Sequence, residues 1–151
     1  MIAPLPLETA RKKPSNPRHR ARQFVLQGLY QSLVGSQDQA SILAQAVGVA
    51  GFDKIDRDLY EALLPRVLDD AGALQEVLTP FLDRSWEEVS PIERGILLMG
   101  ACELKHFPET PYRVVLNEAI ELARSFGGTD GHKFVNGVLD KLAGQLRPQE
   151  N

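Results

Sequence analysis

The chain has 151 residues, 43% of them hydrophobic and 25% charged, a composition that is ordinary for a single soluble globular domain. Its single cysteine, Cys102, excludes an internal disulfide and is typical of proteins of the reducing cytoplasm. No apolar run approaches the roughly 20 residues that span a bilayer, and the N-terminus lacks the long apolar segment of a secretory signal. We therefore expect a cytoplasmic protein without membrane contact.

The net charge of −3 is distributed unevenly along the chain. Residues 1–37 carry six Lys or Arg and one acid, whereas residues 38–151 carry eleven basic and nineteen acidic groups. Nucleic-acid binding depends on the local field of a patch rather than on the charge of the whole chain. Any RNA is therefore expected near the basic end of the chain or on an uncharged surface. The acidic remainder offers a surface to a basic protein partner.

The first part of the chain divides into an arm and two helices. Residues 1–17 contain four of the ten prolines and the run Arg11-Lys12-Lys13 without a helical period, which predicts a disordered basic arm. From residue 18 to about residue 34 the spacing is helical, with an apolar arc opposite a polar, hydrogen-bonding arc that includes Tyr30. A second helix is predicted over residues 38–47.

Hydrophobic residues recur at helical spacing through the rest of the chain. Asp56 is placed to cap a third helix, which Pro65 is expected to kink or divide. Ser90-Pro91-Ile92-Glu93 has the spacing of a capping box with proline at the first helical position, and Thr110-Pro111 repeats this start for the next helix. No segment alternates as a strand, so we predict an all-α fold. A shorter N-terminal group of helices packs on a C-terminal bundle in one domain of residues 18–148.

Residues 117–140, NEAIELARSFGGTDGHKFVNGVLD, form two amphipathic helices joined at Gly127-Gly128. Asp130 is placed to cap the second of these helices. Phe134 lies about 100° from the centre of the core stripe of that helix, given 3.6 residues per turn. An aromatic ring on a helix flank beside Lys133 is suited to stack an unpaired base. The other interpretation makes Phe134 a residue of the peripheral core.

The segment Arg18-His19-Arg20-Ala21-Arg22 is the clearest candidate for phosphate contact. Guanidinium groups match phosphate oxygens in a bidentate manner and also stack on bases. Charge alone does not distinguish such a contact from a solvated tail. Arg18 and Arg22 also project toward the apolar arc, so the pairing of one of them with an acid of the bundle is a further interpretation.

Two stretches, RHRARQFVLQGLY at residues 18–30 and the stretch at 117–140, resemble the NusB family of bacterial transcription antitermination factors. The resemblance covers roughly residues 18–148 and is loose between residues 37 and 84. It implies an all-α fold of about seven helices in two helical subdomains. It also implies a non-catalytic RNA-binding factor of transcription antitermination and termination. Such a factor pairs with NusE, a small-subunit ribosomal protein, and binds boxA RNA within the RNA polymerase antitermination complex, in support of ribosomal RNA transcription.

Transferred position by position, the resemblance assigns residues of this chain to two surfaces. Glu93 and Asp130 match positions on a surface that faces the protein partner, and each is also explained as a helix-start residue. The sequence leaves open a homodimer, and a helical protein-interaction module without RNA binding of its own is the alternative function. RNA contacts are expected at Arg18, His19 (often another arginine in the family), Arg20, Arg22, Tyr30, Phe81 (often tyrosine in the family), Lys133 and Phe134.

Features of catalytic and metal sites are weak in this sequence. His19, His106 and His132 have no metal-ligand spacing to one another or to Cys102. Residues 127–133 are rich in glycine like a phosphate-binding loop, but no strand precedes them and no Gly-Lys-Ser/Thr follows. We therefore expect no enzymatic activity, no metal site and no cofactor.

Overall fold

The computed structural model of the protein describes Leu5 and residues 16–150, which form six α-helices and four short 3-10 helices. The predicted all-α fold is confirmed for this part of the chain. Most of the predicted arm, residues 1–17, lies outside the described residues. The α-helices are α1 (Pro17–Gly35), α2 (Gln39–Val47), α3 (Arg57–Leu78), α4 (Pro91–His106), α5 (Tyr112–Phe126) and α6 (Gly131–Leu146). The 3-10 helices are η2 (Phe52–Lys54), η3 (Thr79–Phe81), η4 (Trp86–Glu88) and η5 (Pro148–Glu150).

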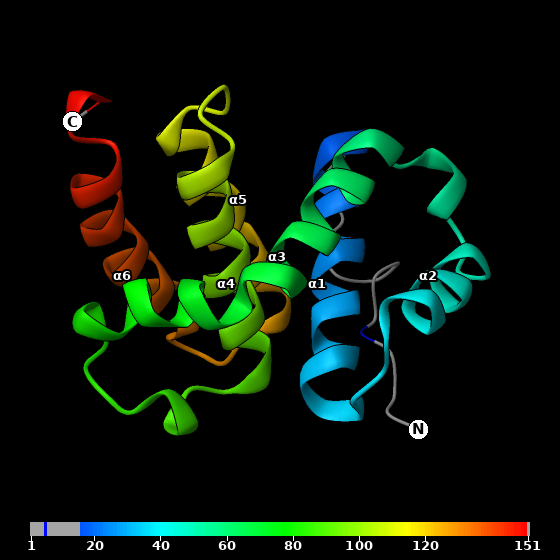
Figure 1. The fold of residues 1–151 in the computed structure, drawn as a ribbon, viewed down its shortest axis with the longest axis horizontal. Helices are drawn as coiled ribbons and strands as arrows, with labels where there is room; N and C mark the ends of the chain where they lie inside the picture. Colours follow the sequence, from blue (N-terminus) through cyan, green and yellow to red (C-terminus); the bar gives the residue numbers. More distant parts are fainter. Residues whose placement is uncertain (1–4, 6–15, 151) are drawn as a thin grey trace.

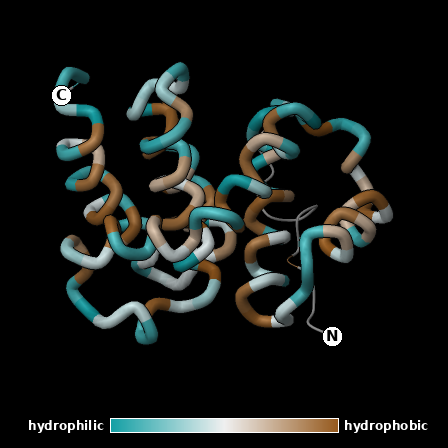
Figure 2. The backbone as a smooth tube through the Cα atoms, in the orientation of Figure 1, coloured by the Kyte–Doolittle hydropathy of each residue, from teal (hydrophilic) through white to brown (hydrophobic). Residues whose placement is uncertain are grey.

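The helices form two groups (Figure 1), and their buried hydrophobic side chains belong to one core. α4, α5 and α6 pack against one another on one side, α1 and α2 lie on the other, and α3 runs across between them. α1 packs against α3 and α4 as well as α2. Hydrophobic and hydrophilic residues are interspersed along the helices (Figure 2). The predicted N-terminal group of helices on a C-terminal bundle is therefore confirmed. Among the described residues, no helix is both long and apolar enough to cross a membrane.

Two helix starts in the N-terminal group follow from capping side chains. Asn16 accepts a hydrogen bond from the backbone N of His19 at 2.8 Å, and α1 begins directly after it at Pro17. Asp56 caps α3 in the same way through Leu59 N at 3.0 Å. Pro65 was predicted to kink or divide this helix, and it does not divide it, because α3 continues through it to Leu78. Proline removes one hydrogen bond of the helix, and the burial of both neighbouring turns in the core holds the helix together.

The starts of α4 and α5 differ from each other. Ser90 caps α4 as predicted, accepting from Glu93 N at 3.2 Å with proline at the first helical position. Thr110 does not cap α5: it is buried before the helix, Pro111 occupies the N-cap position, and no side-chain cap bond is formed. α5 therefore begins at Tyr112. The burial of Thr110, rather than a capping role, accounts for its place before this helix.

Helix α4 lies at the centre of the molecule, and every residue from position 95 to position 104 is buried. Its neighbours come so close that two of its glycines leave no space for a side chain. A Cβ atom at Gly100 would lie 2.6 Å from Cδ1 of Leu139 in α6, and one at Gly95 would lie 2.9 Å from Cδ1 of Leu26 in α1. The glycines thus set the distances at which α6 and α1 pack on α4.

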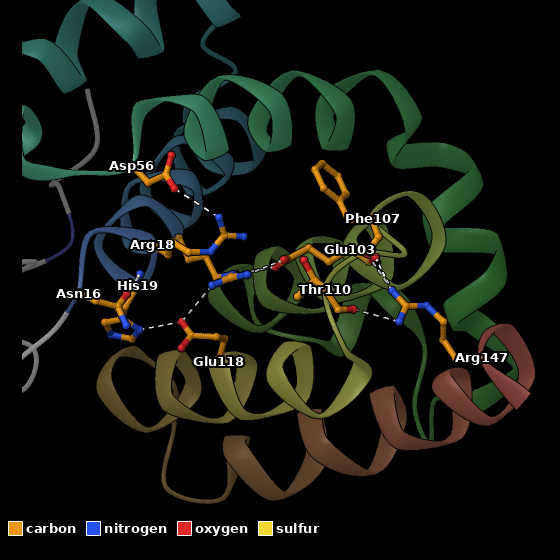
Figure 3. A network of polar contacts seen from close by, with 10 residues as sticks. Asn16, Arg18, His19, Asp56, Glu103, Phe107, Thr110, Glu118 and Arg147 are labelled. Atoms are coloured by element: carbon orange, nitrogen blue, oxygen red, sulfur yellow. Dashed lines mark hydrogen bonds and ion pairs between the residues drawn. The ribbon is translucent and has the colours of Figure 1, made fainter. Parts of the chain in front are cut away.

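Arg147, which follows α6, closes the C-terminal end of α4 (Figure 3). Its guanidinium group is 3% exposed and donates to the backbone oxygens of Glu103, Leu104, Phe107 and Thr110 at 2.9–3.1 Å. The last carbonyls of a helix lack partners within the helix, and a cation there also meets the negative end of the helix dipole. Arg147 therefore fastens the chain after α6 to the end of α4 and to the α4–α5 connection.

We predict that Arg147→Met lowers the free energy of unfolding by roughly 2–5 kcal/mol, because several buried carbonyl groups then lose their donor. Chemical denaturation monitored by circular dichroism measures this change. Arg113→Ala, which removes an exposed arginine at the start of α5, is the control and should change stability by less than about 0.5 kcal/mol. Equal effects of the two substitutions would contradict a structural role for Arg147.

Candidate nucleic-acid interface

The N-terminal end of α1 carries two of the predicted RNA contacts toward the surface. The Arg18 side chain is 52% exposed, and its Nη1 donates to Oδ2 of Asp56 at 3.3 Å (Figure 3). Arg20 is half-buried on the same turn of the helix. An exposed ion pair of this kind contributes little to stability, so Arg18 can exchange its carboxylate partner for a phosphate at small cost.

His19 lies between these two arginines but points into the molecule. Its side chain is 11% exposed, and Nδ1 lies 2.8 Å from Oε1 of Glu118 in α5 (Figure 3). The predicted RNA contact at His19 is therefore not an exposed one. The imidazole ties the start of α1 to α5 instead.

Arg22 is buried as well. Its side chain is 2% exposed, with Nε and Nη2 donating to the carboxylate of Glu103 in α4 at 3.0 and 2.8 Å. Glu118 lies 3.6 Å from the third nitrogen, Nη1. Burial lowers the pKa of Arg22, but the hydrogen bond and the negative charges of Glu103 and Glu118 outweigh this effect, so the net pKa is raised. The pairing of this arginine with an acid of the bundle is confirmed, and we remove Arg22 from the candidate interface.

The polar arc of α1 is also less open than its residue types indicate. Gln23, Gln27 and Gln31 are all buried on this arc, and Oε1 of Gln27 accepts a hydrogen bond from the backbone N of Leu5. Tyr30 is half-buried. It lies ten residues beyond Arg20, which corresponds to about 15 Å along the helix. Tyr30 therefore lies apart from the basic end of α1.

A second group of predicted residues meets at the start of α6. Lys133 is exposed and Phe134 is half-buried at the edge of the core. η3, which carries the half-buried Phe81, packs against α6. Both interpretations of Phe134 thus keep some support, because its ring touches the core and also reaches the surface. We call the surface formed by Phe81, Arg84, Lys133 and Phe134 the α6 corner.

Arg84 is the member of the α6 corner that the sequence did not indicate. Its guanidinium carbon lies 4.0 Å from the centroid of the Phe134 ring, in a cation–π stack. Asp83 accepts from Nε of Arg84 at 2.7 Å and from Nη2 at 3.3 Å, and this pairing is the main cause that raises the pKa of Arg84. Nothing in the local spacing links position 84 to position 134. An arginine three residues after Phe81 is the one local signal.

The two residues assigned to a partner surface have opposite environments. Asp130 is exposed, and it occupies the N-cap position of α6 without the predicted side-chain cap bond. Its Oδ1 lies 3.6 Å from Nζ of Lys133. Glu93 is 8% exposed, and its Oε2 accepts from the backbone N of Gly128 at 3.3 Å. Glu93 therefore lies beneath the α5–α6 loop rather than on the acidic surface.

The described residues contain no group of three or more His, Cys, Asp or Glu arranged to hold a metal ion. Cys102 is fully buried, and burial raises the pKa of its thiol to about 12. A thiol of this pKa is protonated at neutral pH and is a poor nucleophile.

The comparisons with known proteins agree with one another. The model of the NusB family matches residues 19–144. A transcription antitermination protein NusB from Azoarcus sp. is 58% identical over 137 residues, with 88% of this chain and 86% of the relative covered. One from Dechloromonas aromatica is 53% identical over 137 residues and covers 91% of this chain and 84% of the relative. The solved structure of T. maritima NusB superposes with a TM-score of 0.77 at 26% identity, covering 91% of this chain and 97% of the other. With this match in sequence and fold, the chain belongs to the NusB family.

Proposed function

We propose that this protein acts in transcription antitermination and termination as an RNA-binding factor without catalytic activity. In this role it pairs with NusE, a ribosomal protein of the small subunit, and the pair binds single-stranded boxA-like RNA during ribosomal RNA transcription. The names of its relatives support the antitermination role. The RNA and the partner follow from the family resemblance of residues 18–30 and 117–140.

The observation that carries the RNA part of the proposal is the α6 corner. It combines an exposed lysine, a half-buried phenylalanine and an arginine stacked on that phenylalanine at 4.0 Å. Single-stranded nucleic acids bind surfaces that offer aromatic rings and guanidinium planes for stacking, together with cations for phosphate. The Arg84–Phe134 stack supplies such a surface before any RNA arrives, which reduces the entropy that binding must overcome.

The start of α1 supplies a second contact region in this proposal. Arg18 and Arg20 remain as phosphate contacts, while His19 and Arg22 are engaged with Glu118 and Glu103. The basic balance of residues 1–37 adds a positive field at this end of the chain. RNA that reached both regions would extend from α1 to the α6 corner.

The burial of His19 and Arg22 also favours a second candidate function. With two of four basic positions at the start of α1 engaged internally, the arginine-rich segment offers less charge to RNA than its sequence indicates. A helical protein-interaction module would bind its partner through the acidic surface of residues 38–151. For such a module we expect no RNA affinity, even with NusE present. A titration against boxA-like RNA, with and without NusE, distinguishes the two functions.

We predict that Arg18→Ala combined with Arg20→Ala weakens RNA binding and flattens its salt dependence. Each phosphate contact on a single strand contributes about −0.7 to the slope of log affinity against log salt, so losing two flattens it by up to about 1.4. Fluorescence anisotropy at several salt concentrations measures this slope. Arg113→Ala is the control and should leave the slope unchanged.

Arg22→Ala tests the buried arginine separately from Arg18 and Arg20. It leaves Glu103 unpaired inside the bundle, so we expect it to lower the free energy of unfolding by about 3–5 kcal/mol. If Arg18→Ala combined with Arg20→Ala left the salt slope unchanged while circular dichroism stayed native, Arg18 and Arg20 would not belong to the interface.

We predict that Phe134→Ala weakens RNA binding by about 1–3 kcal/mol, the contribution of one base–aromatic stack. Arg84→Ala should weaken binding in the same direction, because the guanidinium group forms the other layer of the platform. Thermal melts and RNA titrations on the same samples measure stability and binding separately. The control is Phe52→Ala, which removes a buried ring from the α1–α3 side and should cost about 3–5 kcal/mol of stability. A Phe134→Ala protein that lost as much stability as the control but kept its RNA affinity would make Phe134 a core residue only.

We predict that Asp130→Asn slows association with NusE and leaves the fold intact. The side chain is 77% exposed in an acidic body, so its charge can steer a basic partner. The effect should be severalfold at low salt and should disappear at high salt, because exposed charges are screened. Stopped-flow association measures it, with Asp53→Asn in η2 as an exposed control. Equal rates for both variants at low salt would exclude Asp130 from the partner surface.

A further inference from the structure

We propose that Glu93 is a positioning residue of the RNA site: its buried carboxylate, which comes from α4, holds the α5–α6 loop and so fixes where Lys133 and Phe134 lie. This inference rests on the proposed RNA-binding function. It gives Glu93 a role that does not need exposure to a partner protein.

The first observation is where the Glu93 side chain goes. Its backbone N is capped by Ser90 at 3.2 Å, as in a capping box. In a complete capping box the glutamate side chain returns to the backbone N of the cap residue. Here Oε2 of Glu93 instead accepts from Gly128 N at 3.3 Å, so the carboxylate links the start of α4 to a loop 35 residues further along the chain.

The second observation is the lack of space around this carboxylate. A Cβ atom at Gly131 would lie 3.1 Å from Cδ of Glu93 and would overlap Oε2. A Cβ atom at Gly127 would lie 3.4 Å from the same oxygen, and one at Gly128 would lie 3.8 Å from it. Two glycines of the loop and the first residue of α6 therefore surround one carboxylate oxygen, and this segment and Glu93 fit each other closely.

The third observation concerns the start of α6. Gly131 is the first residue of this helix, and its N-cap residue, Asp130, forms no side-chain cap bond. The N-terminal end of a helix carries partial positive charge, which a nearby carboxylate stabilises. Because Oε2 of Glu93 lies against Gly131, the acid that faces the buried side of the α6 start comes from α4. Glu93 acts on α6 from a different helix, while Asp130 stays on the surface.

The position of the α6 start then determines the geometry of the α6 corner. Lys133 and Phe134 are the third and fourth residues of α6, within one turn of Gly131. Arg84 stacks on Phe134, and the negative charge of Glu93 contributes, after Asp83, to the raised pKa of Arg84. A loop released from Glu93 would move Lys133 and Phe134 relative to Arg84, which belongs to the α3–α4 connection.

A double-mutant cycle on the full chain tests the inference, with Glu93→Ala, Gly131→Ala and both together. In the absence of RNA, Glu93→Ala should make the Gly128 amide exchange about tenfold faster, because a hydrogen bond to a charged group is lost. RNA affinity should fall several-fold while its salt slope stays unchanged, because Glu93 is buried and contacts no phosphate.

The other variants separate positioning from general destabilisation. Gly131→Ala should weaken RNA binding in the wild-type background and have little further effect beside Glu93→Ala, which removes the oxygen that a Cβ would overlap. Glu93→Gln keeps an acceptor for Gly128 N, so it should restore most of the amide protection and most of the RNA affinity. Thermal melts should show that Glu93→Gln is folded, so a poorly folded alanine variant does not prevent the test.

Several outcomes would overturn the inference. Unchanged exchange of the Gly128 amide in Glu93→Ala would show that Glu93 does not hold the loop. Faster exchange of the Gly128 amide with unchanged RNA binding would make Glu93 a purely structural residue. Faster exchange with stronger RNA binding would mean that its negative charge repels the RNA. A wild-type protein that binds no boxA-like RNA would overturn the proposed function and the RNA role of Glu93 with it. The exchange data would still show separately whether Glu93 holds the loop.

Discussion

The buried pair between Arg22 and Glu103 is the interaction on which the arrangement of the two helix groups depends. Two charges removed from water are stable only when they satisfy each other with good geometry, and here two nitrogens of the guanidinium meet one carboxylate at 3.0 and 2.8 Å. The pair fixes the rotation of α1 on α4. Arg20, two residues before Arg22, projects from roughly the opposite side of the helix, whereas Arg18 shares the face of Arg22 but lies in the first turn of α1, where its side chain is 52% exposed. The structural use of Arg22 thus leaves Arg18 and Arg20 as the arginines of this segment in the proposed RNA site.

Glu103 is held from both sides, which makes the end of α4 a joint between distant parts of the chain (Figure 3). Its side chain pairs with Arg22 of α1, and its backbone oxygen accepts from Arg147 after α6 at 3.1 Å. The first α-helix and the segment after the last one are therefore both connected to α4, although Arg22 and Arg147 lie more than 100 residues apart in sequence. Closely packed glycines on α4 then allow α1 and α6 to approach it directly.

The sequence predicted the elements whose signals are local. Hydrophobic spacing indicated α4, α5 and α6, and the Ser90 cap was placed correctly, because periodicity and capping depend on residues within one or two turns. The sequence left open whether Pro65 kinks or divides α3, and the predicted Thr110 cap of α5 was wrong, because tertiary packing outweighs a local break or cap there. The family resemblance supplied what local patterns lacked, namely the overall fold.

The site shows the same limit more clearly. The run Arg18 to Arg22 alternates basic residues, and the charge pattern alone did not tell which of them would find a buried acid. The acids that pair with Arg22 are Glu103 and Glu118, which lie more than 80 residues further along the chain. Arg84 was missed for a related reason: its stacking partner, Phe134, is distant in sequence and adjacent only in the fold.

Cations are paired with acids both at the α6 corner and at the start of α1, where Arg18 meets Asp56, but the proposed RNA site would use the two regions differently. In the corner each cation has an acid beside it, Arg84 with Asp83 and Lys133 with Asp130. In the proposed RNA site, the corner would contribute the ring of Phe134, with Arg84 stacked on it at 4.0 Å, because aromatic rings and guanidinium planes stack on unpaired bases. The start of α1 belongs to the part of the chain with a positive balance. In the proposed site, phosphate attraction and the salt dependence of binding are then expected mainly from α1, and the inferred role of Glu93 is to hold the geometry of the α6 corner.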